Sequence, residues 1–403
     1  MERLLVSTMR RGRLLILGLC LLSTACRSMS GSDVEESEET VSYKTGNTVL
    51  ITPPRDQGPI GFCWSYGTMA LLESLHLTRT GESIVLSPEA FGFYHYVNLL
   101  KAYFVNEEQI DRLIVMMTRK EGNLDANIIY DRAEYSSPPI LLKAYGVVPE
   151  SVYVKKFPVS MTRTSDADLF HRGLLERINL LIATKGKSYL ETMSEDDIIK
   201  EVMVSPDPSG YTAAPPTSFT FKGKTYTPRS FLKDYLKVDP SALTVKVVYP
   251  ELEESRASNV DQLSLSQFIS YVNRNLAAGI PMPFRVDIDI DRLSQGVFTT
   301  VPLASAGTPP PAFTSIGGHL MLLIGPTRQP LDATENQDRL IVKNSWGSSL
   351  ANPSLLPSDG LYLMEIGYIR EMLKEGYFLG ALMPKVIGKA PFIEGIAPFN
   401  RSQ

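Results

Sequence analysis

Cys63 follows a turn rich in glycine and proline and precedes an apolar segment with helical spacing. Met69, Leu72 and Leu75 recur on one helix face, which predicts a helix from Trp64 onward. Cys63 would then stand at the N-terminus of a helix, where unpaired backbone N–H groups and the helix dipole stabilise a thiolate. The thiolate is the nucleophilic form of cysteine, so this position suits covalent acyl chemistry.

Three other polar residues are singled out by their spacing or by the segments around them. Gln57 lies six residues before Cys63. His319 ends the segment Ser-Ile-Gly-Gly-His and precedes an apolar run, which predicts a turn and then a strand. Asn344 ends a second predicted strand and opens the segment Asn-Ser-Trp-Gly, twenty-five residues after His319.

Together these segments resemble the papain-like cysteine peptidases. The resemblance implies that Cys63 attacks a peptide carbonyl, that His319 acts as its acid–base partner, and that Asn344 orients the imidazole. It also implies an oxyanion hole made by Gln57 and the backbone N–H of Cys63. The residues that it assigns to substrate binding or to shielding of the site are Trp64, Trp346, Gly318 and Gly61. The mechanism calls for no cofactor and no metal.

The middle of the chain is longer than in compact members of this family. Cys63 and His319 are 256 positions apart, against about 130–150 for the papain and cathepsin pattern. Segments 142–153 and 214–231 resemble the bleomycin hydrolase and aminopeptidase C branch. Helical patterns near residues 165–184 and 195–204 indicate that the insertion is mainly helical.

The fold implied is α+β, with a helical lobe that carries Cys63 and a sheet-rich lobe that carries His319 and Asn344. The expected boundaries are a signal at 1–26, a flexible acidic and serine-rich tether at 27–49, a peptidase domain at 50–390 and a tail at 391–403. The insertion is expected at about 100–265, beside the helical lobe and bordering the cleft.

The N-terminus predicts export. Basic residues precede the apolar run Leu14 to Leu22, and small residues then lead to Cys26. This order resembles the bacterial lipoprotein signal, which implies acylation of Cys26 and attachment to the membrane of the bacterial envelope. A plain cleaved signal and an uncleaved anchor are the alternatives.

Composition excludes several other classes of protein. The 403 residues are 43% hydrophobic and 21% charged, as in ordinary globular proteins. A net charge of −4 without a basic cluster beyond the N-terminus argues against nucleic acid as a partner. Only Cys20, Cys26 and Cys63 are cysteines, so the processed chain has one free thiol and no disulfide framework.

A row of alternating carboxylates is the remaining metal candidate. Asp287, Asp289 and Asp291 alternate with isoleucine on a predicted strand, which places them on one face. They could hold calcium, but the EF-hand spacing is absent, and a solvated strand face is the favoured interpretation. The remaining histidines, His76, His95 and His171, are interpreted as structural or surface residues.

Three functions therefore stay open. The first is a cysteine peptidase that hydrolyses peptides or proteins, and the second is an enzyme that passes the same acyl group to an amine acceptor. The third is a catalytically silent lipoprotein that binds peptides or partner proteins in the cleft. The motifs do not determine the natural substrate, exo- or endo-cleavage, subsite preference, membrane leaflet or oligomeric state.

Overall fold

The computed structural model describes residues 43–44, 49–58, 61–118, 137–153, 164–206, 210–249, 262–300, 316–327, 334, 338–347, 360–375 and 379–384. The predicted signal with Cys26, most of the tether, and the tail at 391–403 lie outside the described residues. Within the described residues, no helix is both long enough and apolar enough to span a membrane.

The first long helix, α1, runs Cys63–Thr80 and is buried along most of its length. Its C-terminus is closed by Gly81 at a φ of 73°, a left-handed conformation that suits glycine. The next helix, α2, runs Pro88–Tyr103 and is capped by Ser87, whose side chain accepts the backbone N–H of Ala90. The helix predicted from Trp64 is therefore confirmed, and it begins one residue earlier, at Cys63.

The predicted insertion is mainly helical, as expected. Its longest helix matches the pattern near residues 165–184, and the pattern near 195–204 becomes a short α-helix continued by a π-helix. The elements are α3 Glu107–Thr118, α5 Ser137–Tyr145, α6 Thr164–Lys185, α7 Lys187–Thr192, α8 Glu195–Ile198 and η1 Ile199–Met203. A small hairpin and three short helical turns follow: β3 Phe219–Phe221, β4 Lys224–Tyr226, α9 Pro228–Ser230, η2 Phe231–Tyr235 and η3 Pro240–Ala242.

The second half of the chain forms a nine-stranded sheet within the described residues, in the order β6-β5-β13-β7-β10-β11-β12-β9-β8. Most neighbours are antiparallel, and the pairs β5–β6 and β12–β9 are parallel. The strands are β5 Leu243–Tyr249, β6 Gln262–Ser264, β7 Met282–Asp289, β8 Leu293–Ser294, β9 Val297–Phe298, β10 Ile316–Pro326, β11 Arg339–Lys343, β12 Leu361–Glu365 and β13 Leu379–Pro384. A separate pair joins β1 Tyr43–Lys44 to β2 Leu50–Ile51.

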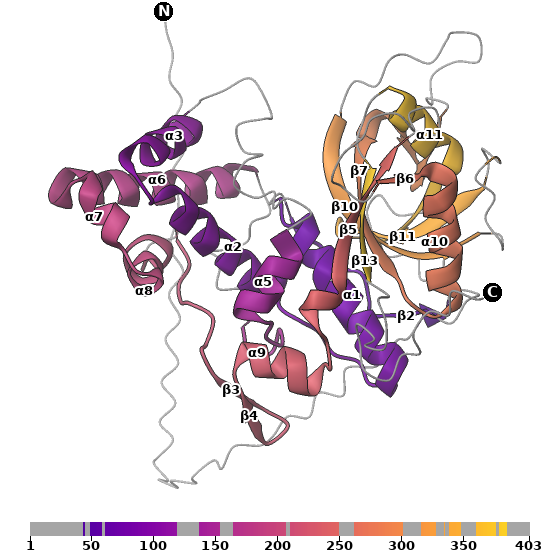
Figure 1. Cartoon of the computed structure of the whole chain (residues 1–403), viewed down its shortest axis with the longest axis horizontal. Helices are drawn as coiled ribbons and strands as arrows, with labels where there is room; N and C mark the ends of the chain where they lie inside the picture. Colours follow the sequence, from indigo (N-terminus) through magenta and orange to yellow (C-terminus); the bar gives the residue numbers. More distant parts are fainter. Residues whose placement is uncertain are drawn as a thin grey trace, which may run out of the picture. The chain divides into compact units, whose positions relative to one another are not determined.

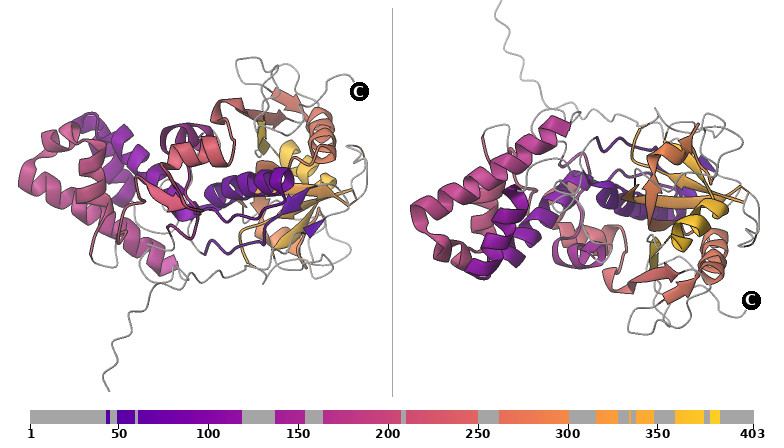
Figure 2. Two further views of the ribbon diagram at one scale, coloured as in Figure 1. Left: turned by 90° about the horizontal axis from the view of Figure 1, so that it is seen from below. Right: turned by 90° about the horizontal axis from the view of Figure 1, so that it is seen from above.

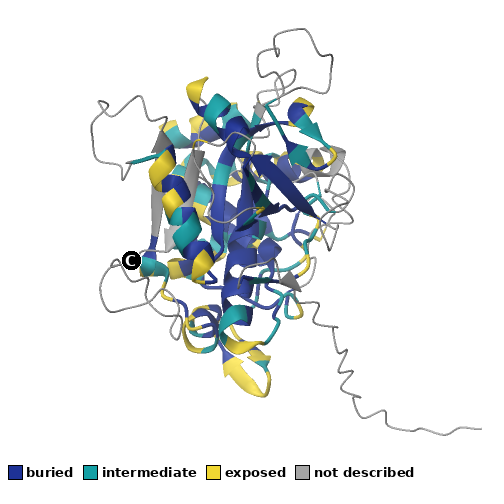
Figure 3. Ribbon diagram, turned by 90° about the vertical axis from the view of Figure 1, so that its right-hand side faces the viewer, coloured by how far each residue is buried: buried dark blue, intermediate teal, exposed yellow. Residues whose placement is uncertain are grey.

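Helix α1 joins the helical and sheet-rich parts of the fold. It packs against α2 and α5 on one side and against β7 and β10 on the other, as Figures 1 and 2 show. Two further helices, α10 Leu265–Ala277 and α11 Ile366–Lys374, also pack on the sheet. Buried apolar residues of α1 and the central strands form one continuous cluster. Figure 3 shows the ribbon of these elements in the colour of buried residues. The elements that carry the predicted site residues therefore belong to one core.

Candidate active site

The thiol stands at the first position of α1. Cys63 is buried, and the preceding Phe62 makes no side-chain cap for the helix. The first turn carries no acidic residue. The N-terminal N–H groups and the helix dipole therefore act on the region of the Cys63 side chain without a competing carboxylate from that turn.

Aromatic packing on both sides fixes the position of Cys63. Phe62 is fully buried against Trp64 and against Gly92 of α2. A Cβ at Gly92 would lie 2.3 Å from the Phe62 ring, so glycine is needed for this approach. Trp64 is also buried, with its ring 5.4 Å from that of Phe91. The ring of Trp64 is enclosed by the core, and its predicted part in substrate binding or shielding stays a prediction.

His319 and Asn344 are brought together from two neighbouring strands. His319 lies within β10, and Asn344 directly follows β11. The imidazole Nε2 lies 2.6 Å from Asn344 Oδ1, and that oxygen also accepts the backbone N–H of Ser345 at 2.7 Å. Because Oδ1 can only accept, Nε2 is the nitrogen that carries the proton in this pair.

The indole of Trp346 covers this pair. It stacks on the imidazole of His319 with 4.4 Å between ring centroids and 29° between ring planes. Tyr362 of β12 meets the indole edge-on at 6.1 Å. The structure thus brings Trp346 onto His319, as the resemblance implies for a shielding residue.

The segment before Cys63 pairs with the segment after β11. The backbone N–H of Gln57 donates to the carbonyl of Ser345 at 2.8 Å, and Asp56 forms a bridge with Trp346. The hydroxyl of Ser345 donates to Gln57 Oε1 at 2.5 Å. Gly347, at a φ of 62°, lies beside Asp56. These contacts hold Gln57 next to the strand end that carries Asn344.

A close contact between α1 and β10 connects the thiol's helix to the imidazole's strand. A Cβ at Gly67 would lie 2.2 Å from Leu320 Cδ2. Gly67 is one helical turn after Cys63, and Leu320 directly follows His319. Of the two glycines predicted at the site, Gly61 lies half-buried two residues before Cys63. Gly318 precedes His319 in β10.

The sequence did not predict a buried cluster formed by Glu73, Arg55, Thr52 and Lys343. Glu73 of α1 accepts hydrogen bonds from Thr52 at 2.6 Å, from Arg55 at 2.7 Å and from the backbone N–H of Leu86 at 2.8 Å. Lys343 donates to Thr52 at 2.9 Å, and burial lowers the pKa of its amine to about 8, against the opposing effect of Glu73.

This cluster adjoins two of the candidate catalytic residues in the sequence. Lys343 directly precedes Asn344, and Arg55 stands two residues before Gln57. Glu73 is a charged residue within an apolar helical segment, and Lys343 follows three apolar residues of its strand. Charged residues in such segments are the signal that could have revealed the buried cluster. A cavity no larger than about one water molecule lies beside the cluster, between α1 and β10.

The row of aspartates differs from its prediction. Asp287 and Asp289 lie on β7, but Asp291 falls in the short helical turn that follows. Asp289 is 1% exposed and accepts the backbone N–H of Asp291, while its own N–H donates to the Tyr368 hydroxyl. The favoured interpretation as a solvated strand face is therefore wrong at Asp289. No group of potential metal ligands occurs among the described residues.

The other histidines lie away from β10 and are buried. His76 stacks on Tyr235, His95 packs against Trp64, and His171 contacts the hydroxyl of Tyr96. Their interpretation as structural residues fits these positions.

Comparison with known proteins identifies the fold. No family model matches the chain. The structure is similar to that of PepW from Lactobacillus rhamnosis HN001, with a TM-score of 0.54 and 15% sequence identity, over 85% of this chain and 82% of PepW. Two further solved structures are more distant. One concerns the mite allergens Blo t 1 and Der p 1, with a TM-score of 0.37, 16% identity, and 83% of this chain and 67% of that chain covered.

The other is procathepsin L 3 of Tenebrio molitor, with a TM-score of 0.31, 15% identity, and 85% of this chain and 72% of that chain covered. The scores of these two are too low to carry an argument, so the fold assignment rests on PepW and on the order of elements described above. The α+β fold expected from the sequence is confirmed, and it is papain-like.

Proposed function

We propose that the chain is a cysteine peptidase that hydrolyses peptide bonds through a covalent acyl-enzyme. The observation that carries the proposal is the 2.6 Å contact between His319 Nε2 and Asn344 Oδ1. His319 lies on β10, which packs against α1, the helix that begins at Cys63. With Nε2 held as a donor, Nδ1 is the nitrogen that exchanges a proton with the Cys63 thiol.

The reaction then follows from the residue types. Cys63 as thiolate adds to the peptide carbonyl, and the oxyanion is stabilised by the backbone N–H of Cys63 and the side-chain amide of Gln57, a donor worth about 3 kcal/mol in the transition state. The imidazolium of His319 gives its proton to the leaving amine as the C–N bond breaks. Water then attacks the thioester while the imidazole takes up a proton of that water, and the C–S bond breaks, which releases the carboxylic acid and restores the thiolate–imidazolium pair.

The test is turnover of a peptide mixture by the purified chain, with products identified by mass spectrometry. Peptides with blocked and with free amino termini distinguish endo- from exo-cleavage. Cleavage by the wild-type chain that is lost in both Cys63→Ala and Cys63→Ser supports the proposal, because a serine hydroxyl at that position is not ionised. Cleavage that persists in Cys63→Ala would contradict it.

The same experiment separates the other two functions. Products that carry an added amine in place of water would identify an acyl-transfer enzyme. Peptide binding without any product would identify a silent binding protein.

We further propose that the chain is exported and anchored to a bacterial membrane by acylation of Cys26. The support is the order of basic, apolar and small residues before that cysteine. Intact mass of the protein purified from membranes tests this: a chain that begins at an acylated Cys26 is expected. An unmodified mature N-terminus in the soluble fraction would contradict the proposal.

A further inference from the structure

Arg285 of β7 lies across Gly318, the residue that precedes His319. A Cβ at Gly318 would lie 2.5 Å from an Arg285 terminal nitrogen and 2.9 Å from its Nε. The guanidinium therefore occupies the space that a side chain at position 318 would fill.

The register of the sheet shows which way this arginine faces. Gly318 is paired with Asp287, and Leu320 is paired with Arg285. Directly paired residues share a face of the sheet, and Leu320 points from that face onto Gly67 of α1. Arg285 and Asp287 thus lie on the face that meets the helix of Cys63.

Both charged groups remain accessible. The Arg285 side chain is 32% exposed and that of Asp287 is 17% exposed, and their closest atoms are 3.8 Å apart. This separation exceeds hydrogen-bonding distance. Of the two charged groups the Arg285 guanidinium is the more exposed, and Asp287 attracts it from one side.

We propose that Arg285, whose guanidinium lies over Gly318, forms a specificity subsite for a substrate side chain that bears a carboxylate, next to the scissile bond. The proposal rests on the peptidase function proposed above. Arginine binds carboxylates through two parallel N–H groups, and partial burial strengthens such a contact. A glutamate or aspartate beside the bond to be cleaved is the expected preference.

The test compares peptide pairs that differ only by Glu against Gln, placed in turn at each of the two positions on either side of the scissile bond. The ratio of kcat/KM within a pair is the readout, and it is insensitive to the amount of active enzyme. At one position the wild type should favour Glu by about tenfold, which is the size of one charge-assisted hydrogen bond.

Two variants and a control locate the effect. Arg285→Met should bring the ratio near one, and Gly318→Ala should lower it because the new Cβ displaces the guanidinium. Arg339→Met is the matched control: Arg339 is a partly exposed arginine of the same sheet, bound to Glu365. The control should keep the wild-type ratio.

A wild-type ratio near one at every position, or a preference for Glu that survives Arg285→Met, would overturn the inference while leaving the peptidase function intact. Absence of all cleavage would instead count against the peptidase function. In that case the dissociation constants of the same peptide pairs for the Cys63→Ala chain test the subsite alone, and equal values would overturn it.

Discussion

Ser345 and Gln57 are 288 positions apart in the sequence and are joined by two hydrogen bonds. The Gln57 backbone N–H donates to the Ser345 carbonyl, and the Ser345 hydroxyl donates to Gln57 Oε1. Because the carbonyl oxygen of the Gln57 amide faces Ser345, its Nε2 group points to the other side. The strand end that carries Asn344 thus orients the amide proposed for the oxyanion hole.

Replacement of Gln57 by alanine is expected to lower kcat by about 10²–10³-fold, the usual loss when one oxyanion donor is removed. Ser345→Ala keeps the donor and removes only the contact that orients it, so its loss should be clearly smaller. Steady-state kinetics on one peptide measure both. Equal activities of wild type and Gln57→Ala would contradict an oxyanion role.

Asn344→Ala is expected to lower kcat/KM by about a hundredfold, near the lower limit of what an acid–base group contributes. The imidazole of His319 would lose the acceptor that fixes Nε2 as the protonated nitrogen. Asn275→Ala is the matched control, since Asn275 is a buried asparagine of α10 outside the site. A loss in Asn344→Ala that disappears after correction for the folded fraction would show that Asn344 acts only through stability.

Lys343 should make the free energy of unfolding depend on pH. Its pKa is lowered by burial to about 8 in the folded chain, against about 10.4 when unfolded. Between these values the unfolded chain binds more protons at this residue, so its contribution to stability rises with pH, by up to about 1.4 kcal/mol per pH unit.

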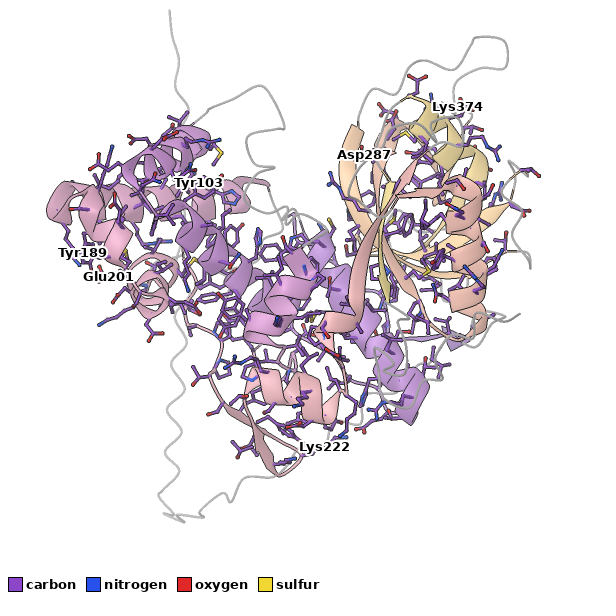
Figure 4. The ribbon with its side chains drawn as sticks, in the orientation of Figure 1. Tyr103, Tyr189, Glu201, Lys222, Asp287 and Lys374 are labelled. Carbon is purple, nitrogen blue, oxygen red and sulfur yellow. The ribbon has the colours of Figure 1, made fainter. Side chains whose placement is uncertain are left out.

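Urea unfolding at pH 8, 9 and 10 compares wild type with Lys343→Met. Burial is the chief cause that raises the pKa values of Tyr66 and Tyr362. Above pH 10 these two tyrosines make the free energy of unfolding fall with pH, but they are present in both proteins. The difference between the two proteins should therefore grow in favour of wild type across this window. Lys374→Met, at an exposed lysine of α11 (Figure 4), should show no such trend. A flat difference for Lys343→Met would contradict the lowered pKa.

Glu73→Gln is expected to lower the free energy of unfolding by about 3–5 kcal/mol, because Arg55 and Lys343 would lose their buried counter-charge. Chemical denaturation measures the loss. Glu371→Gln, at an exposed glutamate paired with Lys374, should cost less than about 1 kcal/mol. A Glu73→Gln chain as stable as wild type would show that the cluster does not depend on this charge.

Local patterns in the sequence were sufficient to predict the elements of the site. The turn and apolar spacing around Cys63 predicted a helix that starts within one residue of the observed position. The apolar runs after His319 and before Asn344 predicted strands β10 and β11. These elements follow from hydrophobic periodicity, which each segment carries by itself.

Contacts between distant segments could not be predicted in the same way. The pairing of Gln57 with Ser345 and the cluster around Glu73 depend on how α1 meets the strands. The enclosure of Trp64 and the burial of Asp289 likewise depend on neighbours far along the chain. Periodicity assigns residues to elements, whereas packing decides which of their faces become accessible.

The most direct test of the account is the reactivity of the thiol at mildly acidic pH. In a chain that lacks residues 1–26, Cys63 is the only cysteine. A thiol with a pKa of about 8.5 is almost wholly protonated at pH 5.5 and reacts very slowly. The chain is mixed there with a limiting alkylating agent and followed by intact mass, beside His319→Ala and, as a control, His76→Ala at the far end of α1.

Fast single modification is expected in wild type and in His76→Ala, and its loss is expected in His319→Ala. A thiol that stays inert at pH 5.5 in the folded chain would contradict an ion pair between Cys63 and His319, and the silent binding protein would then be favoured.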